Sequence, residues 1–197
     1  MGEMSGLGTL IERWQAGDER AAEAIYERTW DSTVGLAYAL LGDMADAEEV
    51  AQDALTCALT HIERYDPERA RFSTWLHTIT VSRCRNRRRR RLLPSLSLAA
   101  WLRQGGEALI PAAPNPEGQA IRAAARDEVW TAIEHLSPSY QEAILLRHWA
   151  DYTYQEIGQI LGCSMRTAQS RVRLAHQQLR HMLTPSDLAV LEENTHG

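Results

Sequence analysis

The stretch TYQEIGQILGCSMRTAQSRVRLAHQQLRHML, residues 153–183, carries start and stop signals for two helices in immediate succession. Thr153 followed three residues later by Glu156 forms a capping box, which predicts that a helix starts at Thr153. Gly162 favours the left-handed conformation that ends a helix, and Ser164 can cap the next helix two residues later. Two helices joined by a glycine turn, the second of them basic, are typical of a helix-turn-helix that binds DNA.

The second of these helices has two opposite faces when it is projected at about 100° per residue. The face expected to enter the core consists of Ala168, Val172, Ala175 and Leu179. The opposite face consists of Arg166, Ser170, Arg173 and Gln177, flanked by Thr167, Gln169 and Arg171. Solvated faces usually mix both signs of charge, but no acidic residue occurs between Ile157 and Ser186.

This face has side chains that suit both parts of a DNA duplex. Arginine can pair with guanine and glutamine with adenine in the major groove, whereas serine, threonine and further arginines suit phosphates. An ordinary solvated basic face is the alternative interpretation. The residues predicted to contact duplex DNA are Ser164, Arg166, Thr167, Gln169, Ser170, Arg171 and Arg173.

Two further helices are expected before residue 153. RDEVWTAIEHL, residues 126–136, has apolar residues at helical spacing, and those expected to face inward are Val129, Trp130, Ile133 and Leu136. In SPSYQEAILLRHW, residues 137–149, Ser137 is the expected cap and Pro138 the first helical residue.

The N-terminal half also has the periodicity of helices rather than strands. Helices are expected at residues 6–15, from the segment GDERA to about Leu41, and from near Asp46 to residue 62. Pro67 ends the third helix, and a fourth begins at Phe72. The third helix has an apolar stripe made of Ala47, Val50, Ala51, Ala54, Leu55, Ala58, Leu59 and Ile62.

The pattern stops after Arg91, where a segment rich in proline and glycine follows. A connection of this length is uncommon inside one compact domain. The fold class is therefore predicted as all-α, with two small helical domains joined by a flexible linker. The expected boundaries are 1–91 for the first domain, 92–124 for the linker, 125–184 for the second domain and 185–197 for a short tail.

Charge is distributed unevenly along this chain, whose formal net charge is −5. The stretch RFSTWLHTITVSRCRNRRRRR, residues 71–91, begins as an apolar helix and ends in five arginines, while acidic residues gather between Asp43 and Asp53. The arginine run can be a solvated run or flexible basic linker, or it can bind nucleic acid. Two basic surfaces and one acidic surface suggest two kinds of partner.

Several classes of protein are disfavoured by the same sequence. The three cysteines are far apart and form no CxxC pair, so neither a disulfide framework nor a zinc site is expected. No cofactor is expected either. A nuclease that uses histidines is disfavoured because these residues lack metal-ligand spacing and paired carboxylates. No signal peptide or membrane span is recognised, and a cytoplasmic location is expected.

Two blocks of the sequence resemble a known family. DAEEVAQDALTCALTHIERYDPERARFSTWLHTITVSRCRNRRRR, residues 46–90, resembles region 2 of bacterial RNA polymerase sigma factors of the extracytoplasmic-function (ECF) group. LSPSYQEAILLRHWADYTYQEIGQILGCSMRTAQSRVRLAHQQLR, residues 136–180, is similar to region 4 of the same group. A dimeric stand-alone DNA-binding regulator is the rival interpretation, but it requires a dimerisation or ligand domain where region 2 is found.

The resemblance implies an alternative sigma factor, not an enzyme, that directs core RNA polymerase to promoters. It places the helix that starts at Phe72 against the minus-ten element, with the loop before it capturing a flipped base of the non-template strand. Trp75 is a candidate for stacking on a base, although its spacing favours the core. The minus-ten candidates are Asp66, Arg69, Arg71, His77, Ser82, Arg83, Asn86, Arg87 and Arg88.

The resemblance also implies protein partners. The acidic face is expected to bind the β′ clamp helices of core RNA polymerase, the second domain is expected to bind the β flap, and an anti-sigma factor is a possible regulator. The candidates for polymerase binding are Asp46, Glu49, Gln52 and Asp53.

Overall fold

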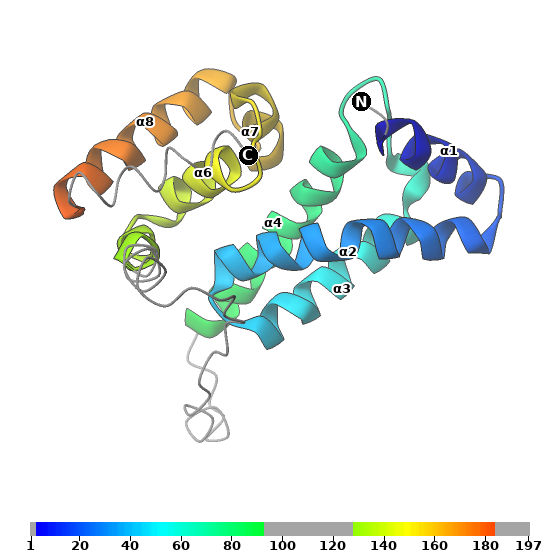
Figure 1. Ribbon diagram of the computed structural model, residues 1–197, viewed down its shortest axis with the longest axis horizontal. Helices are drawn as coiled ribbons and strands as arrows, with labels where there is room; N and C mark the ends of the chain where they lie inside the picture. The colour runs from blue at the N-terminus through cyan, green and yellow to red at the C-terminus, as the bar shows by residue number, and fades with distance from the viewer. Residues whose placement is uncertain (1–2, 93–127, 184–197) are drawn as a thin grey trace, which may run out of the picture.

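The computed structural model describes residues 3–92 and 128–183, and all regular structure in these two ranges is helical (Figure 1). The first range, here called the N-terminal lobe, contains α1 (Glu3–Gln15), α2 (Glu19–Leu41), α3 (Met44–Thr60), a short 3₁₀ turn (Ile62–Arg64) and α4 (Phe72–Leu92). The second, the C-terminal lobe, has a helical segment at residues 128–134, then α6 (Pro138–His148), α7 (Tyr154–Leu161) and α8 (Met165–Met182). The prediction of an all-α fold is confirmed. None of the helices in the described ranges is long and apolar enough to cross a membrane.

The ends of the N-terminal helices follow local capping chemistry. The Asp18 side chain accepts a hydrogen bond from the Arg20 backbone at the start of α2. Gly42 ends α2 in the left-handed conformation, with φ of 70°. Asp43 then caps α3, because its Oδ1 accepts from the backbone N–H of Asp46 at 2.8 Å. The carboxylate that caps α3 is therefore Asp43, three residues before Asp46.

One apolar core lies at the end of the N-terminal lobe that contains α1. It includes Ile25 of α2, Leu55 of α3 and Leu76 of α4, all with at most 1 % of their surface exposed. Burying a side chain of this size contributes about 1.5–3 kcal/mol. Trp75 packs against Tyr65, with ring centroids 5.5 Å apart. This half-buried position agrees with the expectation that Trp75 belongs to the core, although one edge also reaches a cavity described below.

The helix-turn-helix has the local geometry that its sequence predicts. Thr153 and Glu156 form the reciprocal capping box, Gly162 has a φ of 68°, and the Ser164 hydroxyl accepts from the backbone of Thr167 at 3.1 Å. The stripe on α8 that was expected to be buried is buried; its members are Ala168, Val172, Ala175 and Leu179.

One local prediction for the C-terminal lobe is wrong, and a second is confirmed in position alone. Trp130 is exposed rather than inward-facing, because its neighbours Val129 and Ile133 already fill the inner side of this short helix. Ser137 precedes α6 as expected, but its hydroxyl lies 3.3 Å from the Ser139 hydroxyl and makes no cap to the helix backbone. Pro138 occupies the first turn of α6 as predicted.

The two lobes share a second apolar core, which was not predicted. This core joins Leu36 of α2 and Val81 of α4 to Leu146 of α6 and Ile157 of α7. In Figure 1 the C-terminal lobe lies beside α4, and α7 packs against this helix.

Gly35 marks a close approach between the two lobes. A Cβ atom at this position of α2 would lie 2.7 Å from the Trp149 ring, so a side chain at residue 35 would force the ring to move. Glycine in a helix interior costs about 1 kcal/mol relative to alanine. Here it permits the indole of the C-terminal lobe to pack on the N-terminal lobe.

Candidate nucleic-acid interface

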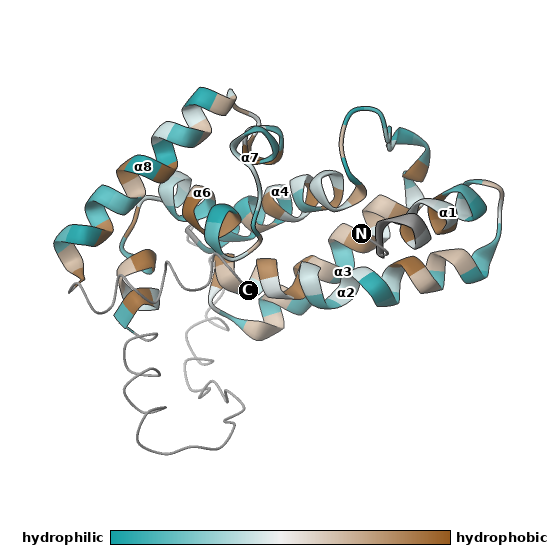
Figure 2. Ribbon diagram, turned by 45° about the horizontal axis from the view of Figure 1, so that its top comes forward, coloured by the Kyte–Doolittle hydropathy of each residue, from teal (hydrophilic) through white to brown (hydrophobic). Residues whose placement is uncertain are grey.

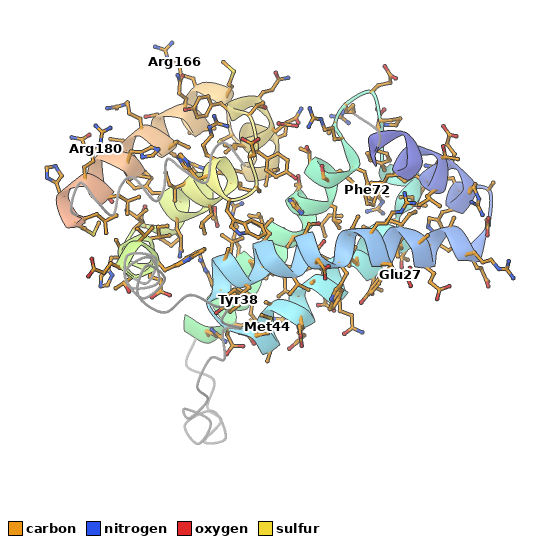
Figure 3. All side chains as sticks on the ribbon, viewed as in Figure 1. Glu27, Tyr38, Met44, Phe72, Arg166 and Arg180 are labelled. Carbon is orange, nitrogen blue, oxygen red and sulfur yellow. The ribbon has the colours of Figure 1, made fainter. Side chains whose placement is uncertain are left out.

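The outer face of α8 is open and positively charged. Arg166 and Arg173 are exposed, and Figure 3 shows Arg166 and Arg180 extending outward from α8, away from the N-terminal lobe. Within residues 3–92 and 128–183, none of these three arginines takes part in an ion pair. Hydrophilic residues predominate on this helix (Figure 2). The face can therefore approach a polyanion without first breaking contacts of its own.

The other residues predicted on this face surround the same open groove or border it. Thr167 and Gln169 are exposed, whereas Ser170 and Arg171 are half-buried. Arg171 bends back, with its Nη1 atom 3.8 Å from the sulfur of Cys163. The groove has a volume of about 960 Å³ and is lined by Arg166, Gln169, Ser170, Arg173, Gln177 and Arg180, among others.

A pair of histidines closes the base of this groove. The Nε2 atoms of His148 on α6 and His176 on α8 lie 2.8 Å apart. Burial, together with the neighbouring His176 and Arg147, lowers the pKa of His148 to about 4. His148, neutral at pH 7, therefore joins α6 to α8 through this contact and helps to fix the orientation of the DNA-facing helix. From the sequence, these histidines are recognisable only as potential metal ligands.

The loop before α4 forms a second concavity. Asp66 turns the chain by accepting a hydrogen bond from the backbone of Glu68 at 3.0 Å. Arg69 and Trp75 help to line a cavity of about 370 Å³ next to it. One wall belongs to the other lobe, because Gln159 of α7 lines this cavity and its Nε2 donates to the Arg69 carbonyl at 3.3 Å.

Three of the minus-ten candidates contact the C-terminal lobe. Arg71 pairs with Glu156 at 3.6 Å. His77 is only 4 % exposed, and its Nδ1 lies 2.8 Å from the Tyr152 hydroxyl. Arg88 donates to the Gln141 amide oxygen at 2.6 Å and also to the Leu40 carbonyl. These contacts differ from the resemblance, which implies that all three residues face DNA.

Other candidates on α4 remain accessible. Ser82 and Asn86 are exposed, and Arg83 is half-buried. Asn86 accepts a hydrogen bond from Arg89 at 3.1 Å. The open part of the predicted minus-ten surface on α4 is therefore narrower than the sequence suggested.

The arginine run at residues 87–91 is not a free cluster of charges. Arg87 Nε donates to Asp46 at 2.9 Å, and both terminal nitrogens of Arg87 donate to Glu49 at 2.8 Å. The hydrogen bond to Asp46 is the main cause of the raised pKa of Arg87. Arg91 also pairs with Asp46 and lies 3.9 Å from Asp43. These pairs form because the end of α4 runs alongside the start of α3.

The acidic residues of α3 consequently divide into two groups. Asp46 is 6 % exposed and engaged by arginines, which differs from the open acidic face that the sequence suggested for it. Glu49, Gln52 and Asp53 are exposed, although Glu49 keeps its pair with Arg87. These three residues form the accessible acidic face of α3.

A further ion pair joins the two lobes and was not among the residues predicted from the sequence. Arg85 donates two hydrogen bonds to Glu142 of α6, at 3.0 and 2.7 Å. The Glu142 side chain is 5 % exposed, and this interaction raises the pKa of Arg85. A second apolar face on α4, with Val81 and Cys84 at helical spacing, was the available signal that another element covers this helix.

Two segments match families of known proteins. Residues 25–92 match Sigma-70 region 2, and residues 126–179 match Sigma-70, region 4. Together the two segments cover more than half of the chain. The first match contains α3, the loop and α4, and the second contains the helix-turn-helix.

Three similar proteins are named as RNA polymerase sigma factors. The chain is 29% identical over 192 residues to ECF RNA polymerase sigma factor SigE of Mycolicibacterium smegmatis, covering 86% of this chain and 70% of the relative. It is 26% identical over 180 residues to RNA polymerase sigma-H factor of Pseudomonas aeruginosa, covering 89% and 93%. It is 29% identical over 182 residues to ECF RNA polymerase sigma-E factor of Escherichia coli, also covering 89% and 93%.

Two solved structures have the same fold. The sigma factor RpoE of Bartonella quintana, in complex with the anti-sigma factor NepR, aligns with a TM-score of 0.60 and 21% identity, covering 81% of this chain and 94% of the other. CnrH in complex with the cytosolic domain of CnrY aligns with a TM-score of 0.61 and 21% identity, covering 87% and 92%.

Proposed function

Because the chain belongs to the ECF group of sigma-70 factors, which direct RNA polymerase to promoters, we propose that it does so through three separate surfaces. The outer face of α8 binds the duplex minus-thirty-five element. The loop at residues 66–71 and the accessible side of α4 bind the melted minus-ten strand. The accessible acidic face of α3 binds core polymerase. The reaction itself belongs to the polymerase, and the protein acts in the cytoplasm, where promoters are transcribed.

The open basic face of α8 is the observation that carries this proposal. It exposes Arg166 and Arg173 opposite a buried stripe, and it has neither acidic residues nor ion pairs to neutralise it within the described chain. Arginine can read guanine bidentately in the major groove, and neighbouring side chains can hold phosphates.

The assignment of the minus-ten strand to α4 depends on the cavity beside Asp66 and Arg69. Its volume of about 370 Å³ and its lining by Trp75 and polar groups suit an unstacked base. Ser82, Arg83 and Asn86 continue the polar surface along the helix. Extruding a base costs a few kcal/mol, which contacts in such a pocket can offset.

The assignment of polymerase to α3 rests on charge and exposure. Asp53 leaves an exposed carboxylate without an ion pair in the described chain, and Glu49 beside it is exposed although it pairs with Arg87. Carboxylates here are complementary to a basic partner and repel DNA. We also propose an anti-sigma factor as a regulator, since the fold is shared with a sigma factor that was solved with one.

Run-off transcription with core polymerase and genomic fragments tests the proposal, with start sites mapped to define the two promoter elements. Asp53→Arg is expected to weaken holoenzyme assembly while the helical content stays the same, because it reverses a charge on the accessible acidic face. Glu27→Arg, an exposed charge reversal on α2, is the matched control (Figure 3). Equal assembly by both variants would remove Asp53 from the polymerase surface.

A further inference from the structure

Part of the surface that the sequence predicts for the minus-ten strand is covered by the C-terminal lobe of the same chain. Arg71, His77 and Arg88 contact Glu156, Tyr152 and Gln141, and Gln159 forms a wall of the base-sized cavity. We propose that the protein has a closed state in which the C-terminal lobe and the minus-ten strand compete for α4. This inference rests on the assignment of that strand to α4.

The charged groups that the C-terminal lobe places at this interface resemble those of nucleic acid, because they are anionic and pair with arginines. The N-terminal lobe supplies the cationic groups, Arg71 and Arg85, and the C-terminal lobe supplies carboxylates, Glu156 and Glu142. A carboxylate presents two acceptor oxygens to a guanidinium, as a phosphate does. Glu156 therefore occupies a position beside Arg71, just before α4, that suits a DNA phosphate, while the Arg85–Glu142 pair holds the lobe against the helix.

Apolar and neutral contacts extend this interface on both sides of the ion pairs. The Tyr152 and His77 rings meet edge to face, with centroids 5.6 Å apart. Trp149 packs over Gly35 of α2. The shared core behind these residues gives the closed state a continuous buried surface. Separating the lobes exposes this surface to water, which opposes opening.

In the closed state the protein cannot bind both promoter elements at the same time. The centres of the two promoter elements are separated by roughly 25 base pairs, which is about 85 Å at 3.4 Å per pair. The packed lobes hold α4 and α7 in contact, and α8 has 18 residues, a length of about 27 Å. The chain between Leu92 and Glu128 can span at most roughly 120 Å, so covalent connectivity permits the separation that simultaneous reading requires.

Closure affects the three proposed surfaces unequally. The outer face of α8 and the exposed residues Glu49 and Asp53 of α3 stay accessible while the lobes are packed. Polymerase and duplex DNA can therefore meet the closed protein, whereas melted DNA meets an occupied site. The free chain is consequently poor at holding single-stranded DNA on α4 until the lobes separate.

Charge exchange between Arg85 and Glu142 tests the closed state in the full-length chain. Glu142→Arg and Arg85→Glu each place like charges together and should open the lobes, whereas the double variant restores an attractive pair in reversed order. Arg85 lies outside the residues assigned to DNA. Opening is measured as an increased radius of gyration in solution scattering and as the rate at which diethyl pyrocarbonate modifies His77, read by mass spectrometry.

The expected result is a rise of at least about tenfold in His77 modification in each single variant, because reactivity follows the open fraction. The double variant should return most of the way to the wild-type rate. Exposed His135 and His181 are internal controls whose rates should not change. Glu128→Arg, an exposed charge reversal, should leave both measurements unchanged.

A milder pair of variants keeps the test valid if charge reversal unfolds the chain. Gly35→Ala pushes a methyl group against Trp149, whereas Gly8→Ala of α1 has no neighbouring atom within 4 Å. Gly35→Ala should increase His77 modification severalfold, and Gly8→Ala should not. Unchanged His77 reactivity and radius in every interface variant would overturn the closed state.

The closed state and the proposed function fail in different ways. Opening of the lobes without any run-off transcription by the wild-type chain would support closure and reject the function. Normal transcription by the wild type, with a constant radius and unchanged His77 modification in all interface variants, would support the function and reject the closed state.

Discussion

Helices α4 and α8 are both rich in arginine and both are expected to meet DNA, yet their arginines have different surroundings. On α8, Arg166 and Arg173 stand in solvent without an ion pair in the described ranges. On α4, Arg85 and Arg87 are held by carboxylates from elsewhere in the chain. The comparison shows that a count of positive charges does not measure the charge available to a ligand.

The difference follows from how each helix is packed. Helix α8 lies at the edge of its lobe and contacts neighbours, α6 and α7, through its apolar stripe. Helix α4 packs against α2, α3 and α7, so more of its circumference meets protein. Three of the seven arginines on α4, Arg85, Arg87 and Arg91, therefore pair with a carboxylate.

The largest difference between the two helices is expected in stability. Arg87→Gln should lower the free energy of unfolding by about 3 kcal/mol, because it leaves the buried Asp46 carboxylate with a weakened set of partners. Arg173→Gln should change it by less than about 0.5 kcal/mol, because this side chain is exposed and makes no ion pair in the described chain. Urea unfolding monitored by circular dichroism measures both. A similar loss in the two variants would contradict the comparison.

The second difference concerns sequence reading, which is assigned to α8. Arg166→Ala should weaken promoter binding by about 1–3 kcal/mol and relax preference at one minus-thirty-five position, if the side chain pairs with guanine. Holoenzyme binding to a panel of single-base promoter variants measures this. Arg180→Ala, at the other end of the exposed face, is the comparison variant. An equal loss on every sequence would make Arg166 a phosphate contact.

The arginine run offers a finer test because its members differ in their partners. Arg89 and Arg90 are exposed and pair with no carboxylate in the described part of the chain, whereas Arg87 and Arg91 do. Replacing Arg89 and Arg90 with glutamine should lower the log–log salt slope of binding to a pre-melted minus-ten fragment by about 1.4 in total, at about 0.7 per phosphate contact. The slope on a duplex minus-thirty-five fragment should not change. An unchanged slope on both fragments would indicate a solvated run.

Sequence reasoning succeeded where the determinants are local. The capping box of Thr153 and Glu156, the left-handed Gly162 and the stripe that includes Val172 are each specified within a few residues. Periodicity likewise located the start of α4 at Phe72. Such features need no knowledge of what lies on the other side of a helix.

The features that were not predicted from the sequence depend on residue pairs that are distant in the chain. Arg85 and Glu142 are separated by 57 positions, and Arg87 and Asp46 by 41. Each side chain taken alone has the pattern of an exposed charge, and only the packing of α4 against α3 and α6 makes them partners. Periodicity shows that a face is apolar but does not identify the element that covers it, which is why the shared core was missed.

The smallest expected effect is that of a lower pH on the fraction of molecules in the open state. It acts through His77 of α4, and no residue of α8 is involved. Burial lowers the pKa of His77 to about 4 in the closed state. Opening exposes the ring, and its pKa then returns toward the ordinary value of about 6.5. Between these two values the open form binds a proton that the closed form does not, so a fall in pH favours opening. The gain is at most about tenfold in the open fraction per pH unit, and it ends below about pH 4.

Solution scattering between pH 7.5 and 5.5 measures this effect as an increase in radius. The Tyr152 hydroxyl next to His77 stays protonated throughout, since burial raises its pKa to about 12. The Arg71–Glu156 and Arg85–Glu142 pairs also cross the interface. The His77→Gln variant retains both ion pairs, so its increase in radius on acidification measures the contribution of those pairs alone. The increase in the wild type should be larger. The His148–His176 pair lies wholly within the C-terminal lobe and is not broken when the lobes separate. An equal pH response in the wild type and His77→Gln would show that burial of His77 does not couple protons to closure.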